Sequence, residues 1–184
     1  MDRRSFLQLG ISSLLLAPSG GAMGGLHMLT PNRGINVNGE GFVIGGISKA
    51  WYSGEVHYFR TPSTEWRSTF QLLREAGANC VATYLPWMFL EPERGRYAVT
   101  GEHSFEQIAL YLKLAQEAEL YVFARPGPFC GSELRTGGLP EWLYEDPSFI
   151  ASDIEGRPMK HRPMSYMHPV YREKAWEWFR RHGD

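Results

Sequence analysis

The sequence has few of the features that mark several common classes of protein. Only two of its 184 residues are cysteines, Cys80 and Cys130, which is too few for a disulfide framework. The formal net charge is −1, so the basic excess of a nucleic-acid-binding domain is absent. The six histidines show no ligand spacing such as H-E-x-x-H, and no G-x-G-x-x-G fingerprint is present. We therefore expect no metal, no cofactor and no nucleic-acid partner.

The chain also lacks a long hydrophobic run near its start. The first apolar run extends from Ile11 to Ala17, whereas a membrane span needs about 20 residues. It follows a basic start with Arg3 and Arg4, and small residues come after it. This order is typical of an export signal, and the paired arginines followed by Phe-Leu resemble the bacterial twin-arginine signal. We expect a signal peptide over residues 1–25 and a periplasmic or extracellular protein; a disordered or anchoring N-terminus is the alternative.

What the chain does contain, from residue 35 on, is an alternation of strand and helix patterns. Asn38-Gly39 lies between short apolar runs and predicts a β-hairpin. Helices are indicated by apolar residues at helical spacing, by capping residues and by terminal glycines. The predicted order is strand 50–58, helix from Thr61 as N-cap to Gly77, strand 80–85, helix from the Ser104–Gln107 capping box, strand 120–124, and helix from Pro169 to Gly183 with Tyr171, Ala175 and Trp178 on one side.

Alternating strands and helices, with strands that read as buried, predict a parallel α/β sheet. Two closures are possible, a doubly wound sheet or a (β/α)8 barrel. A barrel needs about 250 residues, so residues 35–184 would supply about three of its eight units. Cys80 begins one strand and Cys130 follows the end of the next parallel one, so we expect two separate thiols.

Three motifs carry a specific resemblance. They are residues 53–60 (SGEVHYFR), residues 83–87 (TYLPW), and residues 125–143, which contain RPGPF and GGLPEWL. Together they resemble the N-terminal part of the catalytic barrel of glycoside hydrolase family 35, the β-galactosidase family. After residue 143 the sequence is more similar to family 42, a related barrel family.

The resemblance implies a (β/α)8 TIM barrel, of which this chain is the N-terminal portion, and hydrolysis of terminal β-galactosyl residues with retention of configuration. Residues at the carboxyl ends of barrel strands face the active site. In the family, the residues that match Tyr84 and Glu133 contact hydroxyls of the galactosyl unit. Tyr84 could instead cap the barrel core, and Glu133 could be a solvated loop carboxylate. Trp87 could stack on a sugar, although packing under its loop is favoured.

Other residues of the motifs are open to two interpretations. His57, Tyr58 and Arg60 end the first strand and either shape the floor of the site or serve the structure alone. Met88 and Leu90 stand where the family often has Asn and His, which favours a different sugar preference as an alternative.

The resemblance assigns no catalytic residue to this chain. Retaining glycosidases use two carboxylates. In the family the acid/base is a Glu preceded by Asn, and no Asn-Glu pair occurs in the 184 residues. We expect a truncated catalytic domain that is inactive by itself and poorly soluble or partly unfolded when isolated. A non-catalytic or degenerate fragment is the alternative.

Overall fold

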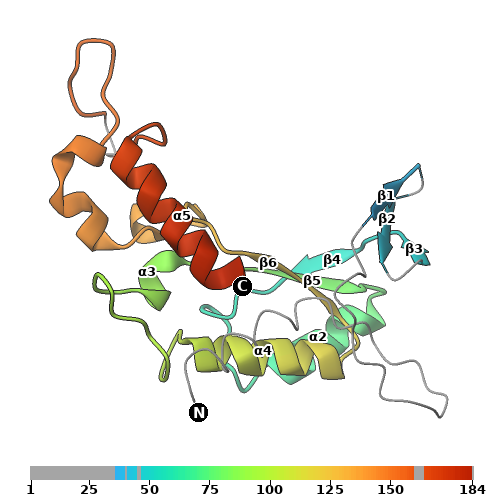
Figure 1. Ribbon diagram of the computed structural model, residues 1–184. Coiled ribbons are helices and arrows are strands. Elements are labelled where there is room, and N and C mark those ends of the chain that lie inside the picture. The colour runs from blue at the N-terminus through green and yellow to red at the C-terminus, as the bar shows by residue number, and fades with distance from the viewer. Residues whose placement is uncertain (1–35, 40, 45–46, 160–163, 184) are drawn as a thin grey trace.

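The computed structural model describes residues 36–39, 41–44, 47–159 and 164–183 (Figure 1). The predicted signal peptide lies outside these residues. Within them, the first sheet is an antiparallel meander of β1 (Asn36–Asn38), β2 (Gly41–Ile44) and β3 (Ile47–Lys49). The predicted hairpin is confirmed, because Asn38 pairs with Gly41 across the turn. The third strand, β3, had no sequence pattern that predicted it.

The second sheet is parallel, as the alternation of strands and helices predicted. It contains β4 (Ser53–Glu55), β5 (Cys80–Tyr84) and β6 (Tyr121–Arg125), with β5 in the middle. The strand predicted over residues 50–58 is shorter than expected, because the chain turns after Glu55 and Arg60 N–H bonds the His57 carbonyl at 3.0 Å.

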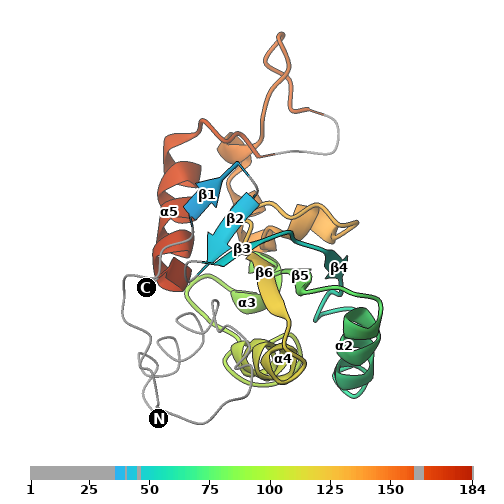
Figure 2. The same cartoon turned by 90° about the vertical axis from the view of Figure 1, so that its right-hand side faces the viewer.

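Helices α2 (Trp66–Glu75) and α4 (Phe105–Glu117) cover one face of the parallel sheet (Figures 1 and 2). Tyr111 of α4 joins the two helices, with its ring 5.3 Å from Trp66 and 5.0 Å from Phe70 in edge-to-face contacts. Both Trp66 and Phe70 are fully buried, as the helical spacing predicted. Burying a side chain of this size stabilises the fold by about 1.5–3 kcal/mol.

The predicted starts of the first two helices had different outcomes. Ser104 caps α4 as predicted, since its Oγ accepts a hydrogen bond from the Gln107 N–H at 3.4 Å. The side-chain Oε1 of Gln107 in turn accepts a hydrogen bond from the His103 N–H at 2.9 Å. Thr61 as an N-cap is wrong, because α2 begins at Trp66 and no side chain caps it. A turn closed by Glu65 N–H and the Pro62 carbonyl precedes the helix, and the Thr61 carbonyl accepts the Trp66 indole N–H at 2.8 Å.

A short helix, α3 (Trp87–Leu90), follows β5, and the last described helix is α5 (Pro169–Gly183). It begins at Pro169, as predicted, and its predicted apolar face is buried at Tyr171, Ala175 and Trp178. The indole of Trp178 stacks on that of Trp87 at 5.1 Å and donates to the Pro126 carbonyl at 2.7 Å. Between β6 and α5, the described residues include the short 3-10 helices Arg135–Gly138, Glu141–Glu145 and Pro147–Phe149.

The other face of the parallel sheet is only partly covered. Phe123 of β6 is 59% exposed, and the face lines an open hollow of about 400 Å³. Two-sided burial, which the sequence predicted for these strands, is therefore incomplete in the part of the chain that the structure describes. The strand–helix order is nevertheless the predicted one, and Cys80 and Cys130 are both free thiols, as expected.

Candidate functional site

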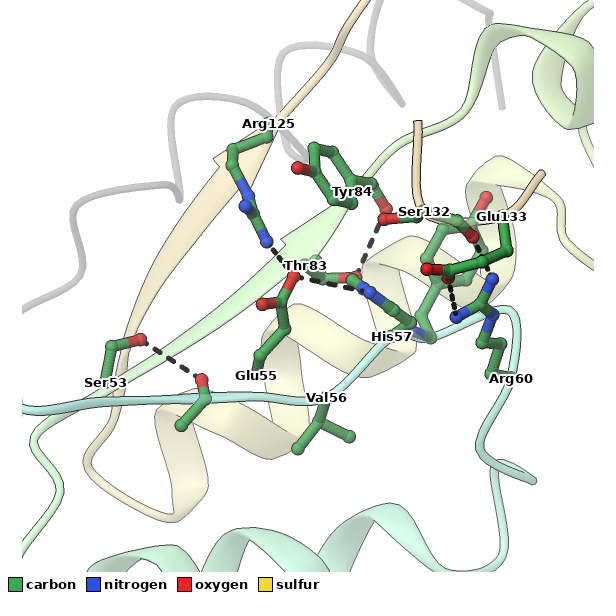
Figure 3. Close-up of polar contacts among 12 residues, drawn as sticks. Ser53, Glu55, Val56, His57, Arg60, Thr83, Tyr84, Arg125, Ser132 and Glu133 are labelled. Carbon is green, nitrogen blue, oxygen red and sulfur yellow. Dashed lines mark hydrogen bonds and ion pairs between the residues drawn. The ribbon is translucent and has the colours of Figure 1, made fainter. Parts of the chain in front are cut away.

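Polar side chains meet where the three parallel strands end. Glu55 is the last residue of β4, Tyr84 of β5 and Arg125 of β6. Tyr84 pairs directly with Arg125, and Glu55 pairs with Ala82, two residues before Tyr84. Alternate residues of a strand point to one face, so Glu55, Tyr84 and Arg125 lie together on the face that the helices leave uncovered (Figure 3).

Arg125 is the centre of this group. Its guanidinium forms an ion pair with Glu55 and lies over the ring of Tyr84, 3.7 Å from the ring centroid. Glu55 also faces His57, whose Nε2 is 3.3 Å from the same carboxylate oxygen. The Glu55 carboxylate therefore contacts both Arg125 and His57, and the Tyr84 ring lies under the Arg125 guanidinium.

The electrostatics of His57 are set mainly by burial. Its side chain is 12% exposed, stacks on Phe59 at 5.0 Å and lies 5.4 Å from the Tyr84 ring. Burial lowers the pKa of His57 below 6.5; Glu55 raises this pKa, whereas Arg60 and Arg125 lower it further. At neutral pH the imidazole is therefore mostly neutral and is an uncharged wall of the site.

Hydrogen bonds fix the segment that carries His57. The N–H of Val56 bonds the Ala82 carbonyl at 3.0 Å, and the Val56 carbonyl accepts the Tyr111 hydroxyl at 2.7 Å. Two residues on, Tyr58 N–H donates to Thr83 Oγ1 at 3.3 Å, and the Tyr58 hydroxyl donates to a backbone carbonyl at 3.1 Å. Val56 and Tyr58 are buried, and burial raises the pKa of the Tyr58 phenol. Tyr58 thus has a structural role.

The second predicted contact, Glu133, lies in the loop after β6. Its side chain is 87% exposed and its Oε2 is 3.4 Å from Nη1 of Arg60. Arg60 also donates to the carbonyl of Ser132, so one guanidinium holds both the backbone and the side chain of this loop (Figure 3). Arg60, which follows β4, brings Glu133 to the edge where Tyr84 ends β5.

The loop that carries Glu133 depends on glycine. The Gly137 carbonyl accepts the N–H groups of Cys130 and Gly131 at 2.8 and 3.1 Å, which closes the loop. Gly137 has φ +65°, and a Cβ at this position would collide with the ring of Phe129. Glycine at this point therefore lets the loop close without displacing the Phe129 ring or straining the backbone.

Trp87 and the residues that follow it have structural roles. Trp87 is 1% exposed and packs on Trp178, so packing rather than sugar stacking is its role here. Glu91 is buried, and its carboxylate accepts the Trp87 indole N–H and the Gly95 N–H, both at 2.7 Å. Leu90 is fully buried, so the departure from the family pattern at this position fills the core and not the surface of the site.

The structure also adds two site residues that the sequence analysis did not single out, Glu55 and Arg125. Each is a charged residue at the last position of its strand, but the strands predicted from the sequence ended at residues 58 and 124, so no local signal marked either position. Among the described residues, no group of three or more His, Cys, Asp or Glu side chains could hold a metal ion. Over the same residues, none of the helices has the length and apolar character needed to cross a membrane.

Comparison with known proteins identifies the family. An α/β domain with polar residues at the carboxyl edge of a parallel sheet is a common framework for enzymes. The sequence model of "Glycosyl hydrolases family 35" matches residues 41–174, and the chain belongs to that family. The match includes residues 144–174, where the sequence also resembled family 42.

Individual relatives agree with this assignment. The chain is 36% identical to the exo-beta-D-glucosaminidase of Thermococcus kodakarensis over 150 residues, 79% of this chain and 19% of the relative. It is 39% identical to the beta-galactosidase of Felis catus over 140 residues, 75% of this chain and 20% of the relative. The chain thus spans about a fifth of the length of these proteins.

A solved structure has a similar fold. The beta-galactosidase of the psychrophilic Marinomonas ef1 superposes with a TM-score of 0.56 at 21% identity, over 70% of this chain and 18% of that one.

Proposed function

We propose that this chain is part of a glycoside hydrolase that releases terminal β-galactosyl residues with retention of configuration. The observation that carries the proposal is the joint position of Tyr84 and Glu133 at the carboxyl edge of the parallel sheet, in a chain that belongs to family 35. A phenol hydroxyl can donate or accept, and a carboxylate can accept two sugar hydroxyls. The two side chains would hold the galactosyl unit.

The framework that we propose is the first three units of a (β/α)8 barrel, formed by residues 35–184. Two observations support this. Helices α2 and α4 cover only one face of the parallel sheet, as the outer helices of a barrel do, and the opposite face carries the site residues at its carboxyl end (Figure 1). The similarity to the Marinomonas structure supports the fold as well.

The chemistry itself requires two more carboxylates. In a retaining enzyme the pair lies about 5–5.5 Å apart, one protonating the leaving oxygen and the other attacking the sugar. The carboxylates at the edge of the sheet already have basic partners, Glu55 with Arg125 and Glu133 with Arg60. We assign them no acid/base or nucleophilic role, and we propose that these 184 residues do not hydrolyse glycosides by themselves.

A different sugar is the second candidate. The relatives include exo-beta-D-glucosaminidases as well as beta-galactosidases, at similar identity. Hydrolysis of a panel of nitrophenyl β-glycosides by the full-length gene product separates the candidates. The proposal expects the highest kcat/KM for the β-galactoside. A preference for the β-glucosaminide would support the second candidate, and no hydrolysis of any member would contradict both.

We also propose that the protein is exported through the twin-arginine pathway. The support comes from the sequence alone, Arg3-Arg4 ahead of the short apolar run.

A further inference from the structure

The ion pair between Glu55 and Arg125 crosses a strand. The sheet order is β4-β5-β6, so the two residues belong to the outer strands and β5 lies between them. The residue of β5 opposite Glu55 is Ala82, and the residue opposite Arg125 is Tyr84. Because Ala82 has only a methyl group on this face, the pair can meet above β5, where Arg125 also covers the Tyr84 ring (Figure 3).

We propose that Arg125 is a positioning residue for substrate binding, with Glu55 as its counter-ion, and that together they fix the ring of Tyr84 so that its hydroxyl meets the sugar. The inference rests on the proposed function, in which Tyr84 contacts the galactosyl unit. A planar guanidinium can stack on an aromatic ring and pair with a carboxylate at the same time, whereas a lysine ammonium is a point charge that does not stack.

His57 completes the support of Tyr84. Its ring, 5.4 Å from that of Tyr84, is held at Nε2 by the same Glu55 carboxylate, 3.3 Å away. Glu55 therefore orders both neighbours of Tyr84. Arg125 acts through the tyrosine, because its guanidinium face is occupied by the ring and one of its amino groups by Glu55.

A double-mutant cycle in the full-length protein tests the coupling, with kcat and KM measured on nitrophenyl β-galactoside. Arg125→Met is expected to lower kcat/KM several-fold, at most the roughly 10-fold expected of Tyr84→Phe, mainly through KM. The double variant is expected to be no worse than Tyr84→Phe alone, since the two residues act on one hydroxyl. Losses that multiply in the double variant would overturn the proposal.

Conservative and control variants complete the test. Arg125→Lys keeps the charge but not the stacking, and it is expected to recover less than half of the loss. The control is Arg67→Met, which breaks the 2.7 Å ion pair between α2 and α4 and is expected to leave kcat/KM unchanged. Full recovery in Arg125→Lys, or an equal loss in Arg67→Met, would overturn the positioning role.

A measurement that needs no activity separates this inference from the proposed function. The side-chain N–H resonance of Arg125 can be assigned by its absence in Arg125→Lys. Because the guanidinium lies over the Tyr84 ring, this resonance is expected to shift when Tyr84→Leu removes the ring and its ring current. An unmoved resonance would overturn the inference even in an active enzyme. If the wild-type protein hydrolyses no glycoside while the resonance moves, the proposed function fails and the Glu55–Arg125 support of Tyr84 stands.

Discussion

At the scale of single residues, Tyr84 and Glu133 are the two proposed sugar contacts, and their environments differ. Tyr84 is half-buried under Arg125, whereas the side chain of Glu133 is 87% exposed and pairs with Arg60. A substrate would therefore meet one half-buried group and one that is open to solvent.

Removing the polar atoms of these residues is expected to weaken substrate binding. Hydrogen bonds to charged groups contribute about 1.5–3 kcal/mol, so Glu133→Gln should lower kcat/KM by roughly 10- to 100-fold; Tyr84→Phe should lose roughly 10-fold. Steady-state kinetics of the full-length protein provide the measurement. Tyr52→Phe, at an exposed tyrosine ahead of β4, is the matched control. Activity of Glu133→Gln equal to wild type would contradict the role.

His57 makes stability depend on pH. Burial holds its pKa in the folded protein below 6.5, so the unfolded chain binds more protons as the pH falls below that value. The contribution of the neutral His57 to the free energy of unfolding is therefore fully present above pH 6.5 and is lost as the pH falls through the lowered pKa. We expect the melting temperature of His57→Gln to fall less than that of wild type between about pH 7.5 and pH 5. Parallel pH profiles for the two proteins would refute the assignment.

At the scale of elements, the loop that carries Glu133 contains a glycine whose replacement tests the loop conformation. Gly137→Ala adds a Cβ at φ +65° against the Phe129 ring, whereas Gly95→Ala adds one at φ +77° with no atom within 4 Å. Both variants incur the cost of positive φ, about 1 kcal/mol. We expect both variants to lower the melting temperature, Gly137→Ala more than Gly95→Ala. We expect Gly137→Ala also to raise KM and Gly95→Ala to leave KM unchanged. Equal effects would show that Phe129 yields without cost.

Local signals in the sequence predicted the elements well where the chemistry is local. Ser104 with Gln107 located the start of α4, and Pro169 located that of α5. The prediction of Thr61 as an N-cap was wrong because a turn follows this residue and its carbonyl accepts a hydrogen bond from the Trp66 indole N–H. The pair between Glu55 and Arg125 could not be predicted, because the partners are 70 residues apart and meet only through the register of three strands.

At the scale of the whole molecule, one face of the parallel sheet forms the core and the other carries the candidate site. One face packs on α2 and α4 and contains the aromatic cluster around Tyr111. The other carries the polar group at its carboxyl edge and the open hollow behind it. Family membership could be predicted from three motifs, since their order and spacing were enough without a structure.

The proposed export can be tested on the whole molecule as well. We expect replacement of both Arg3 and Arg4 by Lys to retain the protein in the cytoplasm, because the paired arginines are the recognised feature of the signal. Cell fractionation of the full-length protein, with Arg33→Lys as the matched control, provides the measurement. Unchanged secretion of the double variant would show that the pathway is a different one.

The stacked pair of Trp87 and Trp178 has an optical consequence. The two indoles lie 5.1 Å apart at an interplanar angle of 21°, close enough for their electronic transitions to couple. Trp87 begins the short helix after β5, and Trp178 lies in the middle of α5, so the coupling exists only while α5 is docked. We therefore expect a circular dichroism couplet from this pair that reports the packing of α5 on α3 without substrate, and we expect Trp178→Phe to abolish it.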